Sequence, residues 1–502
     1  MTKSLLSRRL GIEYQVALIN AAIFALAALA VYLSRVEQLS VVLAPNVVFL
    51  LGSLATFLLL AKSGHSLAPI TWYVMGSGVF FGFGVIAGGL HASEWTTIHY
   101  GSDTRHLVLV NLLNSCSVIL VLATAIAIAH PATSRNGEPG SNAQGDGRHT
   151  LLLRIYPYLM GACGAVVLLK YIIFPLAENL VLRSLLDKAY FFLPSAFLLF
   201  GMLLKRMSFG VLALSATVIL LEVANGVLSF NKYQILTPLV AYMIGLWAAG
   251  RSYRFLLLTM LVLGGVFWTI NPMVSLGRAH HNYDPRKNTV AERYQIFTDY
   301  FNVAVMGRQK ALNPPGTVRE HLDVSSRLSA PERARAVGVR FDVASIEGYL
   351  INEYNSGRPG RSLVDTWAVL VPRLLWPEKP IITRFANELS AQYFNNPSQA
   401  SSAIAPTYAG EAYWNLGPIG AVVVSLFVGG CFGWLSRCSS KAQEGGDPAY
   451  FFVAYPALAS AAFVESWIVA TYIGGFAIIV LSYGAMKFVF SILQRKRLDA
   501  SV

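Results

Sequence analysis

The residues of this sequence that could do chemistry are basic side chains and a few carboxylates, placed beside long apolar segments. Five ionisable residues fall near the ends of these segments: Lys170, Glu222, Lys232, Glu411 and Glu465. A charge at membrane depth is costly, so such residues tend to face a cavity and to mark a substrate path. Arginine binds phosphate oxygens in pairs, and lysine acts as a compact point charge. The pattern favours a cationic pocket for an anionic lipid headgroup, with a diphosphate as a good candidate.

More basic residues lie in one long polar segment, 273–410, which holds 16 Lys plus Arg and 12 Asp plus Glu. Arg340 occurs there in a mostly apolar helical pattern, VGVRFDVASIEGYL. An arginine on such a face needs a ligand or an internal partner, and Asp342 and Glu347 are carboxylates nearby in the sequence. Arg340 is therefore a candidate ligand-binding residue with a structural alternative.

Two further pairs of basic residues follow in the same segment. Arg358 and Arg361 lie on a Gly/Pro turn, NSGRPGRS, where they either reach a phosphate or are simply solvated. Arg373 and Lys379 lie in VPRLLWPEKP, where they either grip a diphosphate or sugar or anchor the chain at the membrane interface beside Trp376.

Glu411 opens the segment GEAYWNLGPIG and is followed by Tyr413 and Asn415. A general base for a hydroxyl must be a carboxylate or a histidine within hydrogen-bond reach. Glu411 is one candidate for this role, and it could equally orient an arginine. The rival bases are three loop histidines: His280, His281 and His321.

The composition decides which class of protein positions these residues. The chain has 502 residues, of which 55% are hydrophobic and 13% charged, with a mean hydropathy of +0.53. These values exclude a soluble globular enzyme and a disordered chain, and they predict an all-α polytopic membrane protein. The net charge of +13 does not indicate nucleic acid, because Lys and Arg gather at the cytoplasmic ends of membrane spans. The four cysteines show neither a disulfide framework nor a metal spacing.

Apolar runs long enough to cross a bilayer predict about twelve spans. The predicted spans are 12–34, 41–61, 69–91, 107–130, 151–174, 186–204, 207–228, 233–250, 253–272, 412–435, 450–467 and 471–491. Every short basic cluster then falls on one side, which places both termini in the cytoplasm. The predicted organisation is a bundle of about nine spans (1–272), a periplasmic loop (273–410), about three further spans (411–491) and a cytoplasmic basic tail (492–502).

The long loop is itself predicted to be helical. Helical periodicity appears in 289–306, 331–356, 361–376 and 381–394. The segment 361–376 carries an apolar stripe from Leu363 to Leu375, and Trp367 and Trp376 suit the membrane interface. The loop is therefore expected to form a small helical cap against the outer membrane surface.

Three short segments resemble one family of membrane enzymes. VPRLLWPEKP (371–380) and GEAYWNLGPIG (410–420) are similar to the "IPR-x-hydrophobic-P-x-KP" and "E-x-Y-x-N-x-G-x-x-G" segments of Wzy-type polymerases of O-antigen and exopolysaccharide repeat units. NKYQIL (231–236) is similar to their "SRG" or "SR-x-x" element, with Lys232 where arginine is usual. The resemblance covers most of the chain as architecture and about 30 residues as motif.

The resemblance implies a GT-C-like fold and a metal-independent glycosyltransferase that needs no cofactor. It would join undecaprenyl-diphosphate-linked oligosaccharides at the periplasmic face of the bacterial inner membrane. Besides that substrate and the bilayer, a chain-length regulator and a flippase would be its partners. The candidate catalytic residues are Glu411 and Arg373, which lie in the resembling segments, and Arg340, which comes from its apolar pattern. The candidates for binding diphosphate or sugar are Lys232, Lys379, Tyr413 and Asn415 of those segments, with Arg358 and Arg361 of the Gly/Pro turn.

Two other classes of function fit the same sequence. An O-antigen ligase would use the same donor with a different acceptor, and the sequence does not reveal the acceptor. A transporter of a polysaccharide or lipid intermediate would more often show internal repeats and charges at the bilayer midplane. Here the charges cluster toward one surface, which favours chemistry there.

Overall fold

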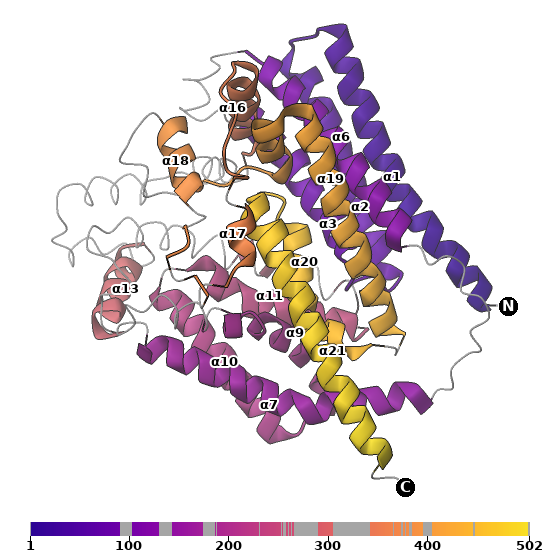
Figure 1. The fold of residues 1–502 in the computed structure, drawn as a ribbon, viewed down its shortest axis with the longest axis vertical. Coiled ribbons are helices and arrows are strands. Elements are labelled where there is room, and N and C mark those ends of the chain that lie inside the picture. The colour runs from indigo at the N-terminus through magenta and orange to yellow at the C-terminus, as the bar shows by residue number, and fades with distance from the viewer. Residues whose placement is uncertain are drawn as a thin grey trace. The chain divides into compact units, whose positions relative to one another are not determined.

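A computed structural model of the chain covers most of the apolar segments and part of the predicted cap (Figure 1). The described residues are 2–90, 103–129, 143–173, 186, 188–229, 231–250, single positions between 252 and 265, 290–304, 342–364, 366–372, 375–376, 378–380, 384–394, 404–444 and 447–499. These residues are almost entirely helical and include no β-strand. An isolated antiparallel bridge joins Thr407 and Glu465. The predicted all-α class is confirmed.

The chain forms two compact units. Unit 1 comprises Met1–Gly140 and Ala334–Val502, and unit 2 comprises Ser141–Arg333. The predicted cap is divided between them. Three of its described helices, α16 (Ala344–Asn355), α17 (Thr366–Leu370) and α18 (Arg384–Tyr393), belong to unit 1, and α13 (Val290–Ala304) belongs to unit 2.

Nine helices of the described residues are long and apolar enough to cross a membrane. They are Ile12–Ser34, Leu39–Lys62, Pro69–Leu90, Arg105–Ala129, Leu151–Lys170, Lys188–Arg206, Phe209–Leu228, Tyr408–Gln443 and Ile468–Leu493. Each coincides with one of the predicted spans, so the chain has the fold of a multi-pass membrane protein.

The other three predicted spans are not matched in this way. The first, 233–250, forms α11 (Lys232–Ala248), which has 17 residues. The second, 253–272, lies largely outside the described residues. The third, 450–467, is not one continuous helix, because η5 (Pro448–Phe452) is followed by α20 (Ala454–Ala462), which ends before the bridge at Glu465. The total of twelve stays a prediction.

Unit 1 is a bundle whose helices are joined by buried amides as well as by apolar packing. Its helices are α1 (Thr2–Ser34), α2 (Leu39–Lys62), α3 (Pro69–Ser77), the π-helix η1 (Gly78–Gly84), α4 (Val85–Leu90), α6 (Arg105–Ala129), α19 (Tyr408–Gln443), η5, α20, the π-helix η6 (Ile468–Gly475) and α21 (Phe476–Asp499). Asn46 Nδ2 of α2 donates to Phe81 O at 2.7 Å and to Asn111 Oδ1 of α6 at 2.8 Å. Asn111 Nδ2 returns a bond to Val42 O at 3.1 Å. Such bonds hold membrane helices together, because an apolar side chain packs against lipid about as favourably as against another helix.

Helices α6 and α19 run side by side in backbone contact (Figure 1). The contact is made by two glycines of VGGCFG: a Cβ on Gly429 would lie 2.6 Å from Val121 O, and a Cβ on Gly433 would lie 2.6 Å from Ala125 O. Small residues four apart allow this close approach between membrane helices. α19 is thereby fixed against α6 over its second half.

Helix α19 is kinked at Gly417, nine residues after it begins at Tyr408. Gly417 has φ +64° and ψ −154°, a combination that is essentially restricted to glycine, and Pro418 follows it. A Cβ on Gly417 would lie 2.4 Å from the hydroxyl of Tyr354, the residue before the last in α16. The kink therefore sets the direction of the first turns of α19 and lets α16 pack against them.

Gly417→Ala is expected to destabilise unit 1 by roughly 1–3 kcal/mol, because alanine must adopt a glycine backbone conformation and displace Tyr354. The matched control is Gly430→Ala on the same helix, where the nearest atom lies 3.8 Å from the added Cβ. Thermal unfolding of purified protein in detergent measures the difference. An equal melting temperature for both variants would contradict the assigned kink.

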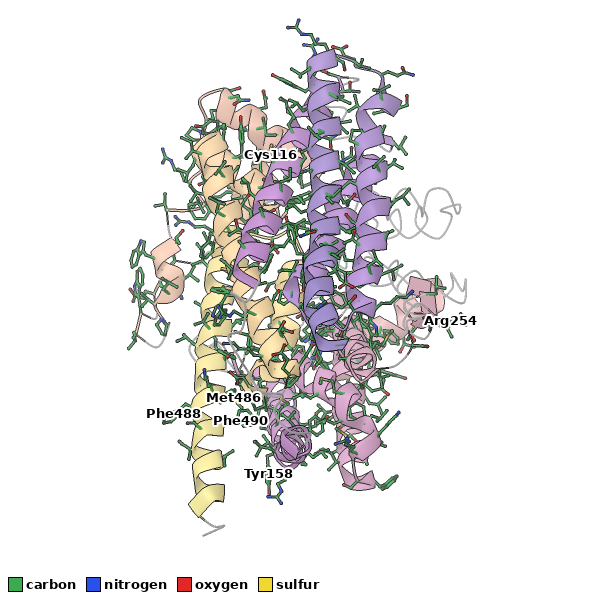
Figure 2. The ribbon with its side chains drawn as sticks, turned by 90° about the vertical axis from the view of Figure 1, so that its right-hand side faces the viewer. Cys116, Tyr158, Arg254, Met486, Phe488 and Phe490 are labelled. Atoms are coloured by element: carbon green, nitrogen blue, oxygen red, sulfur yellow. The ribbon has the colours of Figure 1, made fainter. Side chains whose placement is uncertain are left out.

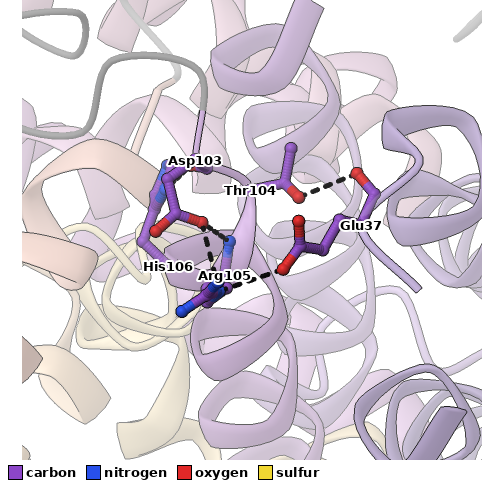
Figure 3. Close-up of polar contacts among 5 residues, drawn as sticks. All are labelled: Glu37, Asp103, Thr104, Arg105 and His106. Carbon is purple, nitrogen blue, oxygen red and sulfur yellow. Dashed lines mark hydrogen bonds and ion pairs between the residues drawn. The ribbon is translucent and has the colours of Figure 1, made fainter. Parts of the chain in front are cut away.

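Polar contacts at the start of α6 fix it to the connection between α1 and α2 (Figure 3). Thr104 Oγ1 donates to Glu37 O at 2.9 Å, and Arg105 Nε lies 3.1 Å from a carboxylate oxygen of Glu37. Asp103 Oδ1 accepts from the backbone N of Arg105 at 2.8 Å. The two charged side chains are 73% and 64% exposed, so their pairing adds little stability and serves mainly to place the helix start.

Unit 2 is a smaller bundle of α7 (Ala143–Ile173), α9 (Leu193–Leu203), α10 (Phe209–Leu228) and α11, with α13 against α10. Tyr156 of α7 and Ser215 of α10 share a buried hydrogen bond of 2.9 Å between their hydroxyls. Phe200 of α9 stacks on Tyr242 of α11 with ring centroids 5.1 Å apart. These contacts join α7 to α10 and α9 to α11.

Candidate functional site

The first candidate site lies where α19 begins. Thr407 is the N-cap of this helix, and its side chain accepts a hydrogen bond from the backbone N of Gly410 at 3.2 Å. Glu411 follows in the first turn and is fully buried. Its two carboxylate oxygens accept from Ser362 Oγ at 2.6 Å and from the backbone N of Ile468 at 2.5 Å. Glu411 therefore joins the cap segment before α17 to the start of η6.

Asn415 lies one turn later and completes the same network. Its Nδ2 donates to Ser362 Oγ at 2.8 Å and to Glu411 O at 2.9 Å, while its Oδ1 accepts from Leu363 N at 3.3 Å. Ser362 thus accepts from Asn415 and donates to Glu411. Asn415 and one carboxylate oxygen of Glu411 are in this way bonded to the cap segment 362–363.

A second buried carboxylate, Glu347, lies beside the first. It belongs to the first turn of α16 and is fully buried. One of its oxygens accepts from Thr407 Oγ1, and the other accepts from Asn114 Nδ2 of α6 at 2.7 Å. A Cβ on Gly410 would lie 2.9 Å from Glu347 Cγ, so the glycine makes room for it. Glu347 therefore joins α16, α6 and the start of α19. Figure 1 shows these three helices near one another.

Burial dominates the electrostatics of this site. It raises the pKa of Glu347 to about 7, against which the hydrogen bonds from Thr407 and Asn114 act in the opposite direction. Burial also raises the pKa of Asp342, whose carboxylate accepts from Ser345 N at 3.1 Å and Ser345 Oγ at 2.5 Å. Within the described residues, no ion pair reaches Glu347 or Glu411. Burial thus raises the pKa of Glu347 well above that of an exposed glutamate.

The predicted arginines of the turn lie at the surface of the cap. Arg358 forms a two-point pair with Glu353, through Nε and Nη2, each at 2.7 Å from a carboxylate oxygen. Hydrogen bonding to Glu353 and its charge raise the pKa of Arg358. Arg361 is exposed and directly precedes Ser362, the residue that binds Glu411. Of the described basic residues, Arg361 is therefore the one next to the buried network along the chain.

Two other predicted binding residues make contacts within the protein. Lys379 Nζ donates to Ala368 O at 3.2 Å and to Val371 O at 2.8 Å, so it caps the carbonyl end of α17. Tyr413 donates from its hydroxyl to Asn355 Oδ1 at 3.2 Å. A helix-capping lysine neutralises the negative end of the helix, and this is the structural alternative to gripping a phosphate.

The remaining predicted residues are distributed differently. Arg340 and Arg373 lie outside the described residues. Lys232 is half-buried at the first position of α11 in unit 2. Among the described residues, no group of three or more His, Cys, Asp or Glu side chains could hold a metal ion. The structure thus brings together Glu411, Asn415 and the segment after Arg361.

Unit 2 holds a separate buried carboxylate. Glu222 of α10 is 1% exposed and accepts from the hydroxyl of Tyr190. Lys170 Nζ of α7 lies 4.1 Å from the centroid of the Tyr190 ring. Lys170 and Glu222 are two of the ionisable residues that the sequence places near span ends. In unit 2 both contact Tyr190.

Sequence reasoning named Glu347 only as a partner for Arg340 and did not name Asn114, Thr407 or Ser362. An asparagine in an apolar span was the available signal for Asn114, since such residues usually bond between helices. Ser362 carried no signal, because a serine on a Gly/Pro turn is ordinary.

The fold and this site define an all-α, multi-pass membrane protein with buried carboxylates where a helical cap meets the bundle of unit 1. Comparison of the chain with protein-family models, with curated proteins and with solved structures found no match.

Proposed function

We propose that this protein is a metal-independent glycosyltransferase that polymerises undecaprenyl-diphosphate-linked oligosaccharide repeat units at the periplasmic face of the bacterial inner membrane, with both termini in the cytoplasm. A hydroxyl of the incoming unit attacks the anomeric carbon of the growing chain, the bond from that carbon to undecaprenyl diphosphate breaks, and the hydroxyl proton passes to the leaving diphosphate or to water. The observation that carries the proposal is the network of Glu411, Ser362 and Asn415, which fixes the arginine-bearing turn of the cap to the entrance of α19.

The exposed arginines supply the electrostatic part of the reaction. Negative charge develops on the diphosphate as the glycosyl bond breaks, and fixed guanidinium groups stabilise it. Arg361 is exposed, whereas Arg358 is already paired with Glu353 and would have to exchange that carboxylate for a phosphate. Arg361 is therefore the first candidate of the described residues, and Arg340 and Arg373 remain candidates from the sequence.

Glu411 acts as a positioning residue in this proposal. Both of its carboxylate oxygens are occupied by protein donors, and the side chain is fully buried, so it does not reach a substrate hydroxyl in this arrangement. Its contribution is to hold the turn 358–362 against α19. Tyr413 lies half-buried on the next part of the same helix and is a candidate for contact with the sugar.

Two alternatives remain. A ligase-like transferase would use the same site with another acceptor. A transporter of a polysaccharide or lipid intermediate is the second candidate function, and the observation that favours it is Glu222, which is buried within a span and has an unpartnered Oε2 atom. Intramembrane ionisable residues often mark transport routes.

Arg361→Ala is expected to slow polymerisation by roughly 10²–10³-fold, because it removes one charge-stabilising group from the leaving diphosphate. The assay uses purified protein in nanodiscs, an undecaprenyl-diphosphate repeat unit from the native host, and EDTA, and it follows the ladder of longer glycans. The control is Arg437→Ala, an exposed arginine near the other end of α19. Arg437→Ala should retain the wild-type ladder.

Each alternative gives a different result in this assay. A substrate that a known polymerase extends but that this protein does not extend would overturn the polymerase proposal. Transfer to a lipid acceptor in one step would identify a ligase. Movement of the substrate across the bilayer without any new bond would identify a transporter, and loss of the ladder in EDTA would contradict metal independence.

A further inference from the structure

An apolar groove of about 290 Å³ lies between α6 and α19 of unit 1. Leu109, Leu113, Cys116 and Leu120 line it from α6, and Pro418 and Val422 line it from α19. The α6 residues recur every three to four positions, so they form one stripe along that helix. Because a helix rises 1.5 Å per residue, the stripe from Leu109 to Leu120 is ~16 Å long.

The packing of the two helices explains why the groove exists. Gly429 brings α19 into contact with the backbone of Val121, which directly follows the last lining residue of α6. Toward the cap, the larger Val422 and Pro418 replace glycine at the interface, and the kink at Gly417 redirects α19. The groove is therefore closed at Leu120 and continues toward α16, where Ile351 lines it.

The surroundings of the groove are apolar on its open side. Leu416, Ile419 and Val423 of α19 are 56%, 75% and 57% exposed, and they flank Pro418 and Val422 in the sequence. Cys116, labelled in Figure 2, is exposed on α6 in the part that runs beside α19. Exposed apolar side chains on spanning helices face the hydrocarbon of a bilayer. The groove thus opens toward lipid along its side.

One end of the groove is polar. Tyr413 lines it there, and its hydroxyl donates to Asn355 Oδ1 at the end of α16. The ~16 Å stripe of α6 is about as long as one leaflet is thick, because the hydrocarbon core of a bilayer measures ~30 Å. The groove therefore has the length and polarity of half a bilayer.

We propose that this groove is a binding site for one acyl chain of a bilayer phospholipid, drawn from the leaflet on the side of α16. The chain lies along Leu109, Leu113 and Leu120, its end reaches the closed end beside Val121, and its glycerol region lies at Tyr413 and Asn355. The match to a single leaflet selects an acyl chain over a long polyprenyl chain, which would overrun the closed end. The groove shares Tyr413 with the proposed glycosyl transfer, but labelling of α6 does not depend on that reaction.

The test uses a phospholipid with a diazirine near the end of one acyl chain, built into nanodiscs with the full-length protein. Photolysis followed by peptide mass spectrometry is expected to label 116–122 of α6 more strongly than the lipid-facing region around Leu26 of α1, which is 67% exposed and serves as the background. Labelling of α6 no greater than this background would overturn the proposal. A parallel arm uses a diazirine-bearing polyprenyl phosphate, and labelling of α6 by that probe alone would also overturn it.

Two variants separate occupancy of the groove from general contact with lipid. Val422→Trp fills the groove and is expected to lower labelling of α6 by roughly tenfold, equivalent to ~1.4 kcal/mol of lost binding. Val423→Trp adds the same ring at the adjacent, lipid-facing position and should leave the labelling unchanged. Equal labelling in the two variants would overturn the proposal.

Cys116 supplies an independent readout, because it is exposed whereas Cys163, Cys431 and Cys438 are buried. In delipidated protein, a lipophilic maleimide is expected to modify Cys116, and added phospholipid is expected to slow that reaction severalfold. Free detergent at the same concentration is the control. A rate that does not change on adding phospholipid would contradict occupancy of the groove.

Discussion

Replacing Glu411 with alanine is expected to destabilise the protein by roughly 3–5 kcal/mol and to abolish activity, whereas Glu411→Gln is expected to retain most of both. Alanine leaves the backbone N–H of Ile468 and the hydroxyl of Ser362 buried without an acceptor. Each unsatisfied buried donor costs ~1–3 kcal/mol, and the cavity adds to this.

Glutamine keeps the shape of the side chain and the bond to Ile468. Its carbonyl oxygen can accept from Ile468 N, and its amide can donate to Ser362 Oγ, which has two lone pairs, so only the proton of the Ser362 hydroxyl loses its acceptor. A positioning residue therefore tolerates this change, while a general base does not, because an amide cannot accept the proton.

Thermal unfolding and the glycan-ladder assay together test this expectation. The matched control is Glu444→Ala, an exposed carboxylate at the other end of α19, which should behave as the wild type. If Glu411→Gln melted like the wild type but made no ladder, Glu411 would be a catalytic base and the positioning role would be wrong.

The sequence predicts the membrane spans better than it predicts the contacts of Glu411. Length and apolarity are local properties, so nine of the twelve predicted spans coincide with helices that could cross a membrane. The kink at Gly417 had a local signal in the Gly-Pro pair, but its conformation depends on Tyr354, which lies in another helix. Local sequence patterns therefore predict which helices form better than they predict where those helices bend.

The candidate site was less predictable because its bonds are long-range. Ser362 and Glu411 are 49 residues apart, and Asn114 and Glu347 are 233 apart. Periodicity reports only which face of an element is apolar, and it carries no information about the partner of a buried polar group. Periodicity also gave no partner for Lys379, although its partners, the carbonyls of Ala368 and Val371, are only 11 and 8 residues away. Motif resemblance drew attention to Glu411 and Asn415 but could not supply Glu347.

The stability of the protein is expected to fall as pH rises toward 7, and Glu347→Gln is expected to remove most of that dependence. Burial raises the pKa of Glu347 from its ordinary 4.5 to about 7. Between these two values the folded state binds the proton and the unfolded state does not. The free energy of unfolding therefore decreases by about 1.4 kcal/mol per pH unit in this window, roughly 3 kcal/mol in all, and then levels off.

The neighbours of Glu347 are compatible with a neutral group. Asn114 Oδ1 is buried and has no hydrogen-bond partner in the described structure. Once the Asn114 amide turns, this oxygen can accept from a protonated Glu347 or from the amide of a glutamine. Thr407 Oγ1 can donate to the carbonyl oxygen of either group. Glutamine should therefore make the protein more stable than the wild type above pH 7, where the wild type buries a charge.

Thermal unfolding in detergent from about pH 4.5 to about pH 8.5 measures this effect. Glu353→Gln is the control on the same helix, because its carboxylate pairs with Arg358 near the surface, and it should keep the wild-type slope. Glu347→Ala separates the effect of charge from that of hydrogen bonding. It removes the titrating group but also leaves Thr407 and Asn114 without their acceptor. The alanine variant should therefore be less stable than the glutamine variant at every pH. If Glu347→Gln kept the wild-type slope, the proton near neutral pH would belong to another group.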